Sequence, residues 1–385
     1  MHGQKKYTEI FRGNFDHSNA FTFWKGRVAL YAILRALGIG EGDEVILPGY
    51  TCVMDVNPIK YVGAEARYVD IEPHTFNMDV NLLEAAITPR TKLIIAQHTY
   101  GYVCDMEPIM AIAQAKGITV IEDCCLCVGS TYKGKLAGTF GAATYFSGQW
   151  NKPYTTGIGG IAATSSPETA EAIEKLCLAE LIQPSFKEAA MLQAQLLIYK
   201  MFIYPRTTAL AQEIFRWLTR KGIVVGSSSN EEFEPVMPKG FFKAMSNVQA
   251  AEGVRKLKKL PENMAHRREI ANLYDKLLAG HGWQPRQYDK SVQDPVMVRY
   301  PVRITDKEAA LEAASKHGIE LGSWFECALH PHETPLGKYG YTIGMCPEAD
   351  RASAQTVNLP LHTRVSERTA RKTVDFITRF EQVRV

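Results

Sequence analysis

The sequence predicts an α/β protein with a mostly parallel sheet that helices cover on both faces. Short apolar strands alternate with helical segments through the first half of the chain, which is the pattern of such sheets. The chain has 385 residues, of which 46% are hydrophobic, so it can bury a sizeable core. This length predicts two domains, a large one over residues 1–255 and a smaller α+β domain over residues 256–385.

The expected elements of the first half follow one another closely. Helices are expected at 28–37, 80–87 and 105–116, and strands at 44–47, 67–71, 92–96, 118–122, 144–147 and 161–164. Asp105 is expected to cap a helix that Gly117 ends, and Pro48 stops a strand. In open α/β sheets, ligands bind beyond the carboxyl ends of the strands, and Asp123 and Ser147 both fall at such ends.

The segment 167–221 is expected to be mostly helical, and it is unusually apolar. Two stripes are expected along it, the first formed by Leu196, Leu197, Met201 and Phe202, the second by Ile214, Trp217 and Leu218. A helix pair packed on the sheet or on a partner subunit is the favoured interpretation. The alternative is contact with a membrane surface, with basic residues on the polar side of the helix.

From about Lys256 onward the pattern changes to a long helix, then strand, helix and strand, which indicates the smaller domain. Thr305 and Glu308 are expected to form a capping box before a helix that reaches Lys316.

Composition excludes several classes of function. The net charge of +3 gives no electrostatic reason to propose a nucleic-acid partner. No stretch approaches the roughly 20 apolar residues of a membrane-spanning helix, and no signal-peptide core follows the N-terminus, so a cytoplasmic location is expected.

The spacing of Cys124, Cys125 and Cys127 suits neither a zinc ribbon nor a disulfide framework. We interpret them as small buried hydrophobes and predict no metal site, with a metal or redox role as the alternative.

The strand that ends in Glu122 and Asp123 is the first candidate for chemistry. Side chains alternate along a strand, so one of these carboxylates must point into the crevice. A buried carboxylate there needs a cationic partner, and a protonated pyridine nitrogen is one. A helix cap or a metal ligand is equally consistent with the pair alone.

Lys152 lies in a loop of small and hydroxyl residues between two expected strands. An amine removed from water is available to form an imine. The hydroxyl of Ser147 and the backbone amides around Gly26, at a helix N-terminus, could hold a phosphate. A solvated surface lysine remains an equal alternative on these residues alone.

Short runs at characteristic spacing are spread over nearly the whole chain. They are GRVAL at 26–30, GDEVILP at 42–48, AITPRTK at 86–92, HTYG at 98–101, IED at 121–123, GSTYKGK at 129–135, FS at 146–147, the lysine at 152 with TTGIGG at 155–160, MSNVQAA at 245–251 and LPLH at 359–362. In this order they resemble the DegT/DnrJ/EryC1/StrS family of fold-type I pyridoxal-phosphate enzymes, which are chiefly sugar aminotransferases.

The resemblance implies a large pyridoxal-phosphate-binding domain with a mixed, mostly parallel seven-stranded sheet. It implies that Lys152 forms the internal aldimine and shuttles protons, while Asp123 pairs with the pyridine nitrogen. Ser147, Gly26 and the amides of Arg27 and Val28 would bind the cofactor phosphate. The family works as homodimers with a shared site, so a homodimer is implied.

Four departures from the family pattern mark an outlying member. Leu126 stands where the family usually has Gln or His near the cofactor ring, and Cys52 stands where an aromatic residue usually stacks on it, although Tyr50 is its neighbour. Phe242, Lys243 and Ala244 replace an Asn-Tyr-Arg run, so Lys243 is expected to supply a charge to the phosphate. Ile158 replaces a usual acidic residue.

The leading functional hypothesis is transfer of an amino group, by resemblance from glutamate, to a keto-sugar that is expected to be nucleotide-linked, as in polysaccharide biosynthesis. His330, His332 and Tyr100 are candidate substrate contacts. One alternative is a different reaction with the same cofactor, such as elimination or cyclisation, which the loss of a hydrogen-bonding residue at Leu126 motivates. Another is a cofactor-binding regulator without turnover.

Overall fold

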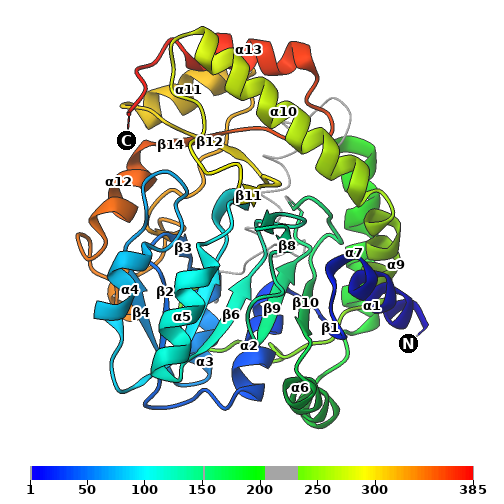
Figure 1. The fold of residues 1–385 in the computed structure, drawn as a ribbon. Helices are drawn as coiled ribbons and strands as arrows, with labels where there is room; N and C mark the ends of the chain where they lie inside the picture. Colours follow the sequence, from blue (N-terminus) through cyan, green and yellow to red (C-terminus); the bar gives the residue numbers. More distant parts are fainter. Residues whose placement is uncertain (1, 151, 204–232, 385) are drawn as a thin grey trace.

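A seven-stranded sheet forms the centre of the computed structural model, which describes residues 2–150, 152–203 and 233–384 (Figure 1). The strand order is β1(Asn19–Phe23), β10(Gly160–Thr164), β9(Ala143–Ser147), β6(Thr119–Asp123), β5(Thr91–Gln97), β2(Glu44–Pro48) and β4(Glu65–Val69). The five strands from β9 to β4 are parallel, while β10 is antiparallel to both of its neighbours, β9 and β1. The predicted mixed, mostly parallel sheet is confirmed.

The central strands are buried on both faces, and their side chains enter two separate cores in alternation. On β6, Ile121 belongs to a core that also contains residues of α2(Gly26–Ala36) and α3(Val53–Tyr61). Its neighbour Val120 belongs to a second core, with residues of α1(His2–Phe15), α4(Val80–Ala86) and α5(Met106–Lys116). The parity of a residue along β6 therefore decides which layer of the molecule its side chain enters.

The expected elements of the sheet are present, but α1, β1 and α3 were not expected. Of the two capping predictions, the one at Asp105 is correct in position only, and the one at Thr305 is wrong. Asp105 is the N-cap of α5, but its carboxylate makes no capping hydrogen bond and instead accepts one from the Tyr132 hydroxyl. The N-cap of α11(Lys307–His317) is Asp306 rather than Thr305, because the Asp306 carboxylate accepts the Ala309 amide at 2.9 Å.

Two helices, α6(Pro167–Glu180) and α7(Phe186–Ile198), and a π-helical turn at Tyr199–Ile203 occupy the described part of the apolar segment. Leu196 packs in a small core with Leu192, Trp24, Trp150 and Ile158. Leu197 is 58% exposed and Met201 is 53% exposed, so these two residues of the expected stripe do not pack on the sheet, and packing on a partner subunit stays a prediction. Ile214, Trp217, Leu218 and the Phe202 side chain lie outside the described residues. Within the described residues, no helix is both long and apolar enough to cross a membrane.

The C-terminal part lies above the carboxyl ends of the sheet strands in the view of Figure 1. The helix α9(Asn247–Leu257), which packs beside α1, leads into this part. The helices of the C-terminal part are α10(Leu260–Gly280), α11, α12(Pro347–Gln355) and α13(Glu367–Ile377), and its antiparallel pair is β12(Tyr300–Arg303) with β14(Thr356–Leu359). Short pairings connect it to the first half: β13(Leu329–His330) with β3(Thr51–Cys52), and β11(Gln293–Asp294) with β7(Thr131–Tyr132), which in turn pairs with β8(Lys135–Leu136). One hydrophobic core contains residues of both parts, so the division at 255/256 stays a prediction.

Gln249 on α9 ties the C-terminal part to the loops around α2 and β10. Its side chain is fully buried, and its Nε2 donates to the carbonyls of Trp24 at 3.1 Å and Ile158 at 2.7 Å.

We expect Gln249→Leu to lower the free energy of unfolding by about 1–3 kcal/mol, because both carbonyls lose a buried donor. Urea denaturation measures this. The control Gln114→Leu, on the exposed face of α5, should leave the unfolding midpoint unchanged, and an equal loss in both variants would contradict the assignment.

Candidate active site

The carboxyl ends of β2, β5, β6 and β9 meet at one edge of the sheet, beside the start of α2. Asp123 lies two residues after Ile121 on β6, and Tyr145 lies beside it on β9, so both side chains point to the same face as that of Ile121. This face is covered by the layer that contains α2 and α3. Tyr145 lies directly across from Asp123 in the register of β6 and β9. The predicted crevice residues at these strand ends are therefore brought to the same side of the sheet.

Asp123 is only 3% exposed, and one of its oxygens accepts the Cys125 amide at 2.8 Å. This single backbone bond fixes the orientation of the carboxylate without neutralising its charge. Burial raises the pKa values of Cys125, Tyr145 and Asp55, and the charge of Asp123 is the second cause for each of them, so this charge acts on several groups at this edge of the sheet.

The start of α2 forms a shallow cradle against Ser147. No side chain caps the helix at Lys25, and its first residue is Gly26. A β carbon on Gly26 would lie 3.0 Å from the Ser147 β carbon, so glycine permits this close approach. The Val28 amide already donates to the Lys25 carbonyl at 3.1 Å, so the amides at the very start of the helix are better placed to face an anion.

A network of hydrogen bonds holds the loop that carries Lys152. Thr156 donates its amide to the Gly148 carbonyl at 2.8 Å, and its hydroxyl donates to the Ile158 carbonyl at 2.7 Å. The Lys152 side chain is half-buried, and its Nζ lies 5.2 Å from the centroid of the Trp324 ring. The position of Lys152 is thus set by a fixed turn, and its amine lies under a C-terminal aromatic residue.

Trp324 was not expected from the sequence, and two buried tyrosines position it. The Tyr100 hydroxyl donates to the Trp324 carbonyl, and the Tyr50 hydroxyl accepts the Phe325 amide at 3.1 Å. The two hydroxyls lie 2.8 Å apart. The guanidinium carbon of Arg299 lies 4.8 Å from the centroid of the Trp324 ring, so two cationic side chains contact this ring.

Asp55, in the first turn of α3, is a further unexpected member of the site. Its carboxylate accepts the Tyr145 hydroxyl at 3.1 Å and the Thr51 hydroxyl at 3.4 Å. Burial, and then the charge of Asp123, raise the pKa of Asp55 to about 8, although Tyr145, Lys152 and Arg27 act in the opposite direction. The protonation of Asp55 therefore depends on the charges that surround it at this edge of the sheet.

Of the three other residues predicted to contact the cofactor, one lies at this edge of the sheet, one lies in the core and one forms an ion pair elsewhere. Cys52 is half-buried here, and burial raises the pKa of its thiol to about 12. Leu126 packs in the core on the α2 side. Lys243 pairs with Glu188, and its Nζ lies 5.7 Å from the centroid of the Trp24 ring.

The three candidate substrate contacts also differ in placement. His330 lies across from Cys52 in the β3–β13 register, and burial lowers its pKa to about 4. His332 is exposed. Tyr100 is fully buried, with its hydroxyl engaged by Tyr50 and Trp324. Their assignment as substrate contacts stays a prediction.

The chain was compared with known families, proteins and structures. The model of the DegT/DnrJ/EryC1/StrS aminotransferase family matches residues 3–194 and 206–378. The chain belongs to this family.

Relatives in sequence and structure agree with that membership. The chain is 34% identical over 350 residues to the GDP-perosamine synthase of Caulobacter vibrioides, which covers 89% of this chain and 80% of that protein. It is 29% identical over 348 residues to the spore coat polysaccharide biosynthesis protein SpsC of Bacillus subtilis, covering 88% of this chain and 79% of that protein. The PLP-form of the sugar aminotransferase Spr1654 from Streptococcus pneumoniae matches with a TM-score of 0.74 at 23% identity, covering 98% of this chain and 90% of that one.

These comparisons confirm the predicted family and fold class. The fold is that of the fold-type I aminotransferases, and the chain is an enzyme of the transferase class. Aminotransferases of this family depend on pyridoxal phosphate (PLP).

The raised pKa of Asp55 predicts a pH dependence of stability in the cofactor-free protein. The folded state binds the proton with a pKa of about 8, against an ordinary value of 3.8. The stabilisation is therefore complete below about pH 3.8 and is lost as the pH rises through about 8. We expect the free energy of unfolding to fall as the pH rises from about 4 to about 8, and to level off above about pH 8, in urea titrations at different pH values.

Asp55→Asn, which keeps the shape and cannot ionise, should flatten this slope. The control Asp375→Asn, at an exposed position on α13, should keep the slope of the unaltered protein. A slope that survives in Asp55→Asn would exclude Asp55 as its source.

Proposed function

We propose that this enzyme binds PLP through Lys152 and transfers an amino group, with glutamate as donor, to a keto-sugar that is nucleotide-linked. The observation that carries the proposal is the convergence of Lys152, Asp123 and the start of α2 at one sheet edge. The relatives named as a GDP-perosamine synthase and as a polysaccharide biosynthesis protein support a nucleotide-sugar acceptor.

The described residues fit the cofactor. Asp123 is a buried carboxylate with a single backbone donor, which suits a cationic ring nitrogen. The start of α2 at Gly26 and Arg27 lies beside Ser147, which suits a phosphate, whereas the Val28 amide would have to leave the Lys25 carbonyl to reach one. We assign Asp123, Gly26, Arg27, Val28 and Ser147, together with Lys152, Cys52 and Leu126, to the cofactor site. Lys243 pairs with Glu188, and we propose that its ammonium group would also bind the cofactor phosphate.

When bound, PLP supplies an electron-accepting ring that stabilises negative charge at the substrate carbon. The carboxylate of Asp123 holds a positive charge at the ring nitrogen. Lys152 holds the cofactor covalently and, once released from it, takes and returns a proton at the substrate carbon through Nζ. Leu126 contributes only apolar contact, so the hydrogen bond that the family usually makes at this position is missing here.

Asp55 adds a proton-holding group to this mechanism. Burial and the nearby charge of Asp123 raise the pKa of Asp55 to about 8, so Asp55 holds a proton near neutral pH. Asp123 would hold the cationic ring nitrogen of the cofactor. The carboxyl of Asp55 can then donate a hydrogen bond into the site.

Arg299 is the residue that we assign to the carboxylate of the amino donor. It is half-buried, and within the described residues no salt bridge joins it to a carboxylate. Burial lowers its pKa, an effect that Glu320 partly offsets. Its guanidinium stacks on the ring that also contacts Lys152, so a donor carboxylate bound there would bring the amino group towards Lys152.

The quaternary state and the location belong to the same proposal. A homodimer is supported by the exposed apolar residues Leu197, Ile198 and Met201 on one helical segment. The cytoplasm is supported by eight cysteines that are all free thiols.

Lys152 should be the site of covalent attachment. Borohydride reduction followed by peptide mass spectrometry should place a reduced pyridoxyl group on the peptide with residue 152. Lys152→Ala should lose this label and at least about 100-fold in amino transfer, because the base is removed. The exposed control Lys135→Ala should keep both. A label on another lysine, or none with bound cofactor present, would refute the assignment.

Arg299→Gln should weaken binding of glutamate without weakening binding of the sugar. Loss of a charged hydrogen bond costs about 1.5–3 kcal/mol, which predicts a rise in KM for glutamate of roughly 10- to 100-fold. Steady-state kinetics with each substrate varied in turn measures this, and the exposed Arg351→Gln is the control. Equal rises in both KM values would show that Arg299 is not donor-specific.

A further inference from the structure

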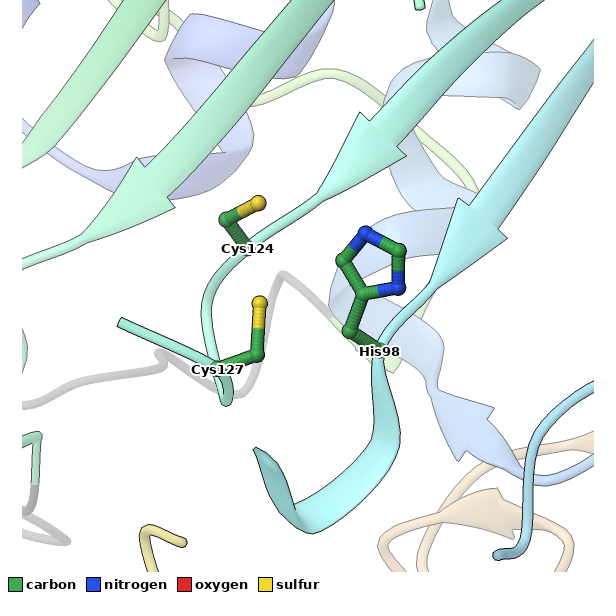
Figure 2. Close-up of side chains that lie close together, drawn as sticks. All are labelled: His98, Cys124 and Cys127. Atoms are coloured by element: carbon green, nitrogen blue, oxygen red, sulfur yellow. The ribbon is translucent and has the colours of Figure 1, made fainter. Parts of the chain in front are cut away.

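Three side chains with metal-binding atoms meet behind the end of β6. Cys124 and Cys127 come from the turn after the strand, and His98 comes directly after the neighbouring strand β5 (Figure 2). Their ligand atoms all lie within 4.8 Å of one another. All three residues are buried, with His98 and Cys124 at 0% exposure and Cys127 at 1%.

This cluster is on the opposite face of the sheet from the proposed cofactor site. Cys124 and Cys127 belong to the core that contains α1 and α5, whereas Cys125 and Leu126 belong to the core that contains α2. The thiols of Cys124 and Cys127 therefore point to the face of the sheet that α1 and α5 cover, and the thiol of Cys125 points to the face that α2 covers. Sequence spacing did not reveal the set, because its third member is far away in the chain.

We propose that His98, Cys124 and Cys127 bind a zinc ion. Two thiolates and an imidazole are a donor set that Zn²⁺ prefers, whereas Mg²⁺ and Ca²⁺ require oxygen ligands. Zn–S bonds of about 2.3 Å and Zn–N bonds of about 2.0 Å place tetrahedral ligand atoms roughly 3.3–3.8 Å apart. The observed cluster is within about 1 Å of that arrangement, so side-chain rotations can close it.

Glu122 is the nearest candidate for the fourth position. Its Oε2 lies 3.0 Å from His98 Nε2, and by strand alternation it lies on the same face as Cys124. The same oxygen accepts the Gly138 amide at 2.7 Å, and the other oxygen accepts the amides of Phe140 and Gly141, both at 2.7 Å. The carboxylate is thus held in place and keeps its negative charge.

The imidazole of His98 is also held from its other side. Nδ1 accepts the Cys104 amide at 3.1 Å, which leaves Nε2 as the nitrogen that faces Glu122. A ring fixed through one nitrogen presents the other in a defined direction, as metal-binding histidines generally do. Zinc would replace the proton that Nε2 now shares with Glu122.

The cluster is closed to water. His98, Glu122 and Cys124 are 0% exposed, and Cys127 is 1% exposed. A bound Zn²⁺ would displace the thiol protons, and its charge would be balanced by the two thiolates and the Glu122 carboxylate.

The proposed ion would stabilise the turn that follows Asp123. Cys124 is the next residue after Asp123, and Cys127 donates its amide to the Cys124 carbonyl at 3.5 Å, which is a weak closure of the turn. Metal bonds from both cysteines would fix that turn. The inference does not depend on the reaction, because the metal lies behind the sheet rather than at the proposed substrate site.

Metal analysis of the purified holoenzyme tests the proposal. Inductively coupled plasma mass spectrometry should find about one zinc per chain after dialysis against a metal-free buffer. Cys124→Ser and Cys127→Ser should each lose at least about nine-tenths of it, because serine is a far weaker zinc ligand. The matched control Cys125→Ser, whose side chain points to the other face, should retain it.

A second measurement needs no variant, so a folding defect cannot obscure the answer. Reconstitution of the unaltered chain with Co²⁺ should give thiolate-to-cobalt charge-transfer bands and the visible bands of a tetrahedral ion. Absence of zinc together with absence of these bands would overturn the proposal. So would zinc that survives in both serine variants, or a Cys124–Cys127 disulfide in non-reducing peptide maps. The covalent label at Lys152 is read separately, so the two proposals fail independently.

Discussion

The two adjacent buried carboxylates at the end of β6 are the constraint on which the site depends. Burying a carboxylate is costly unless hydrogen bonds or a cation compensate it. Glu122 is compensated within the protein, by three backbone amides and His98. Asp123 has one backbone amide, and so its charge is largely left for a ligand. Strand alternation separates the two, and one short strand thereby builds a structural network on one face and a binding site on the other.

The same uncompensated charge explains the behaviour of its neighbours. Burial, and then the nearby charge of Asp123, raise the pKa of Asp55 to about 8, so that Asp55 keeps its proton well above the usual pH range of a carboxyl group. Lys152 and Arg27 oppose this effect without removing it. A cationic ring bound at Asp123 would change the balance of the whole cluster, so cofactor binding and the protonation of Asp55 are linked. Thiols at this edge, such as Cys52, stay protonated and unreactive.

Much of the sheet and part of the site could be predicted from sequence, for identifiable reasons. Buried parallel strands give continuous apolar runs, and turn residues such as Gly117 mark helix ends, so most central strands were located. Asp123 and Ser147 are the last residues of β6 and β9, and Lys152 lies in the loop after β9, so their placement can be read from the order of the sequence. Trp324 and Arg299 come from the C-terminal part, and only tertiary packing through Tyr50 and Tyr100 brings Trp324 above Lys152. Capping failed at Asp105 because the Tyr132 hydroxyl, distant in sequence, competes for the same oxygen.

The interpretation of the cysteines shows how far spacing alone can mislead. The pair Cys124 and Cys127 was judged against ligand sets that are contiguous in sequence, and on that basis it resembled buried hydrophobes. Yet β5 and β6 are neighbours in the sheet, and Gln97 pairs with Asp123, so the residues that follow the two strands must meet. His98 and Cys124 occupy those two positions. Parallel pairing thus converts two strand ends into one cluster, and the same geometry that aims Asp123 into the active site aims its neighbour at His98.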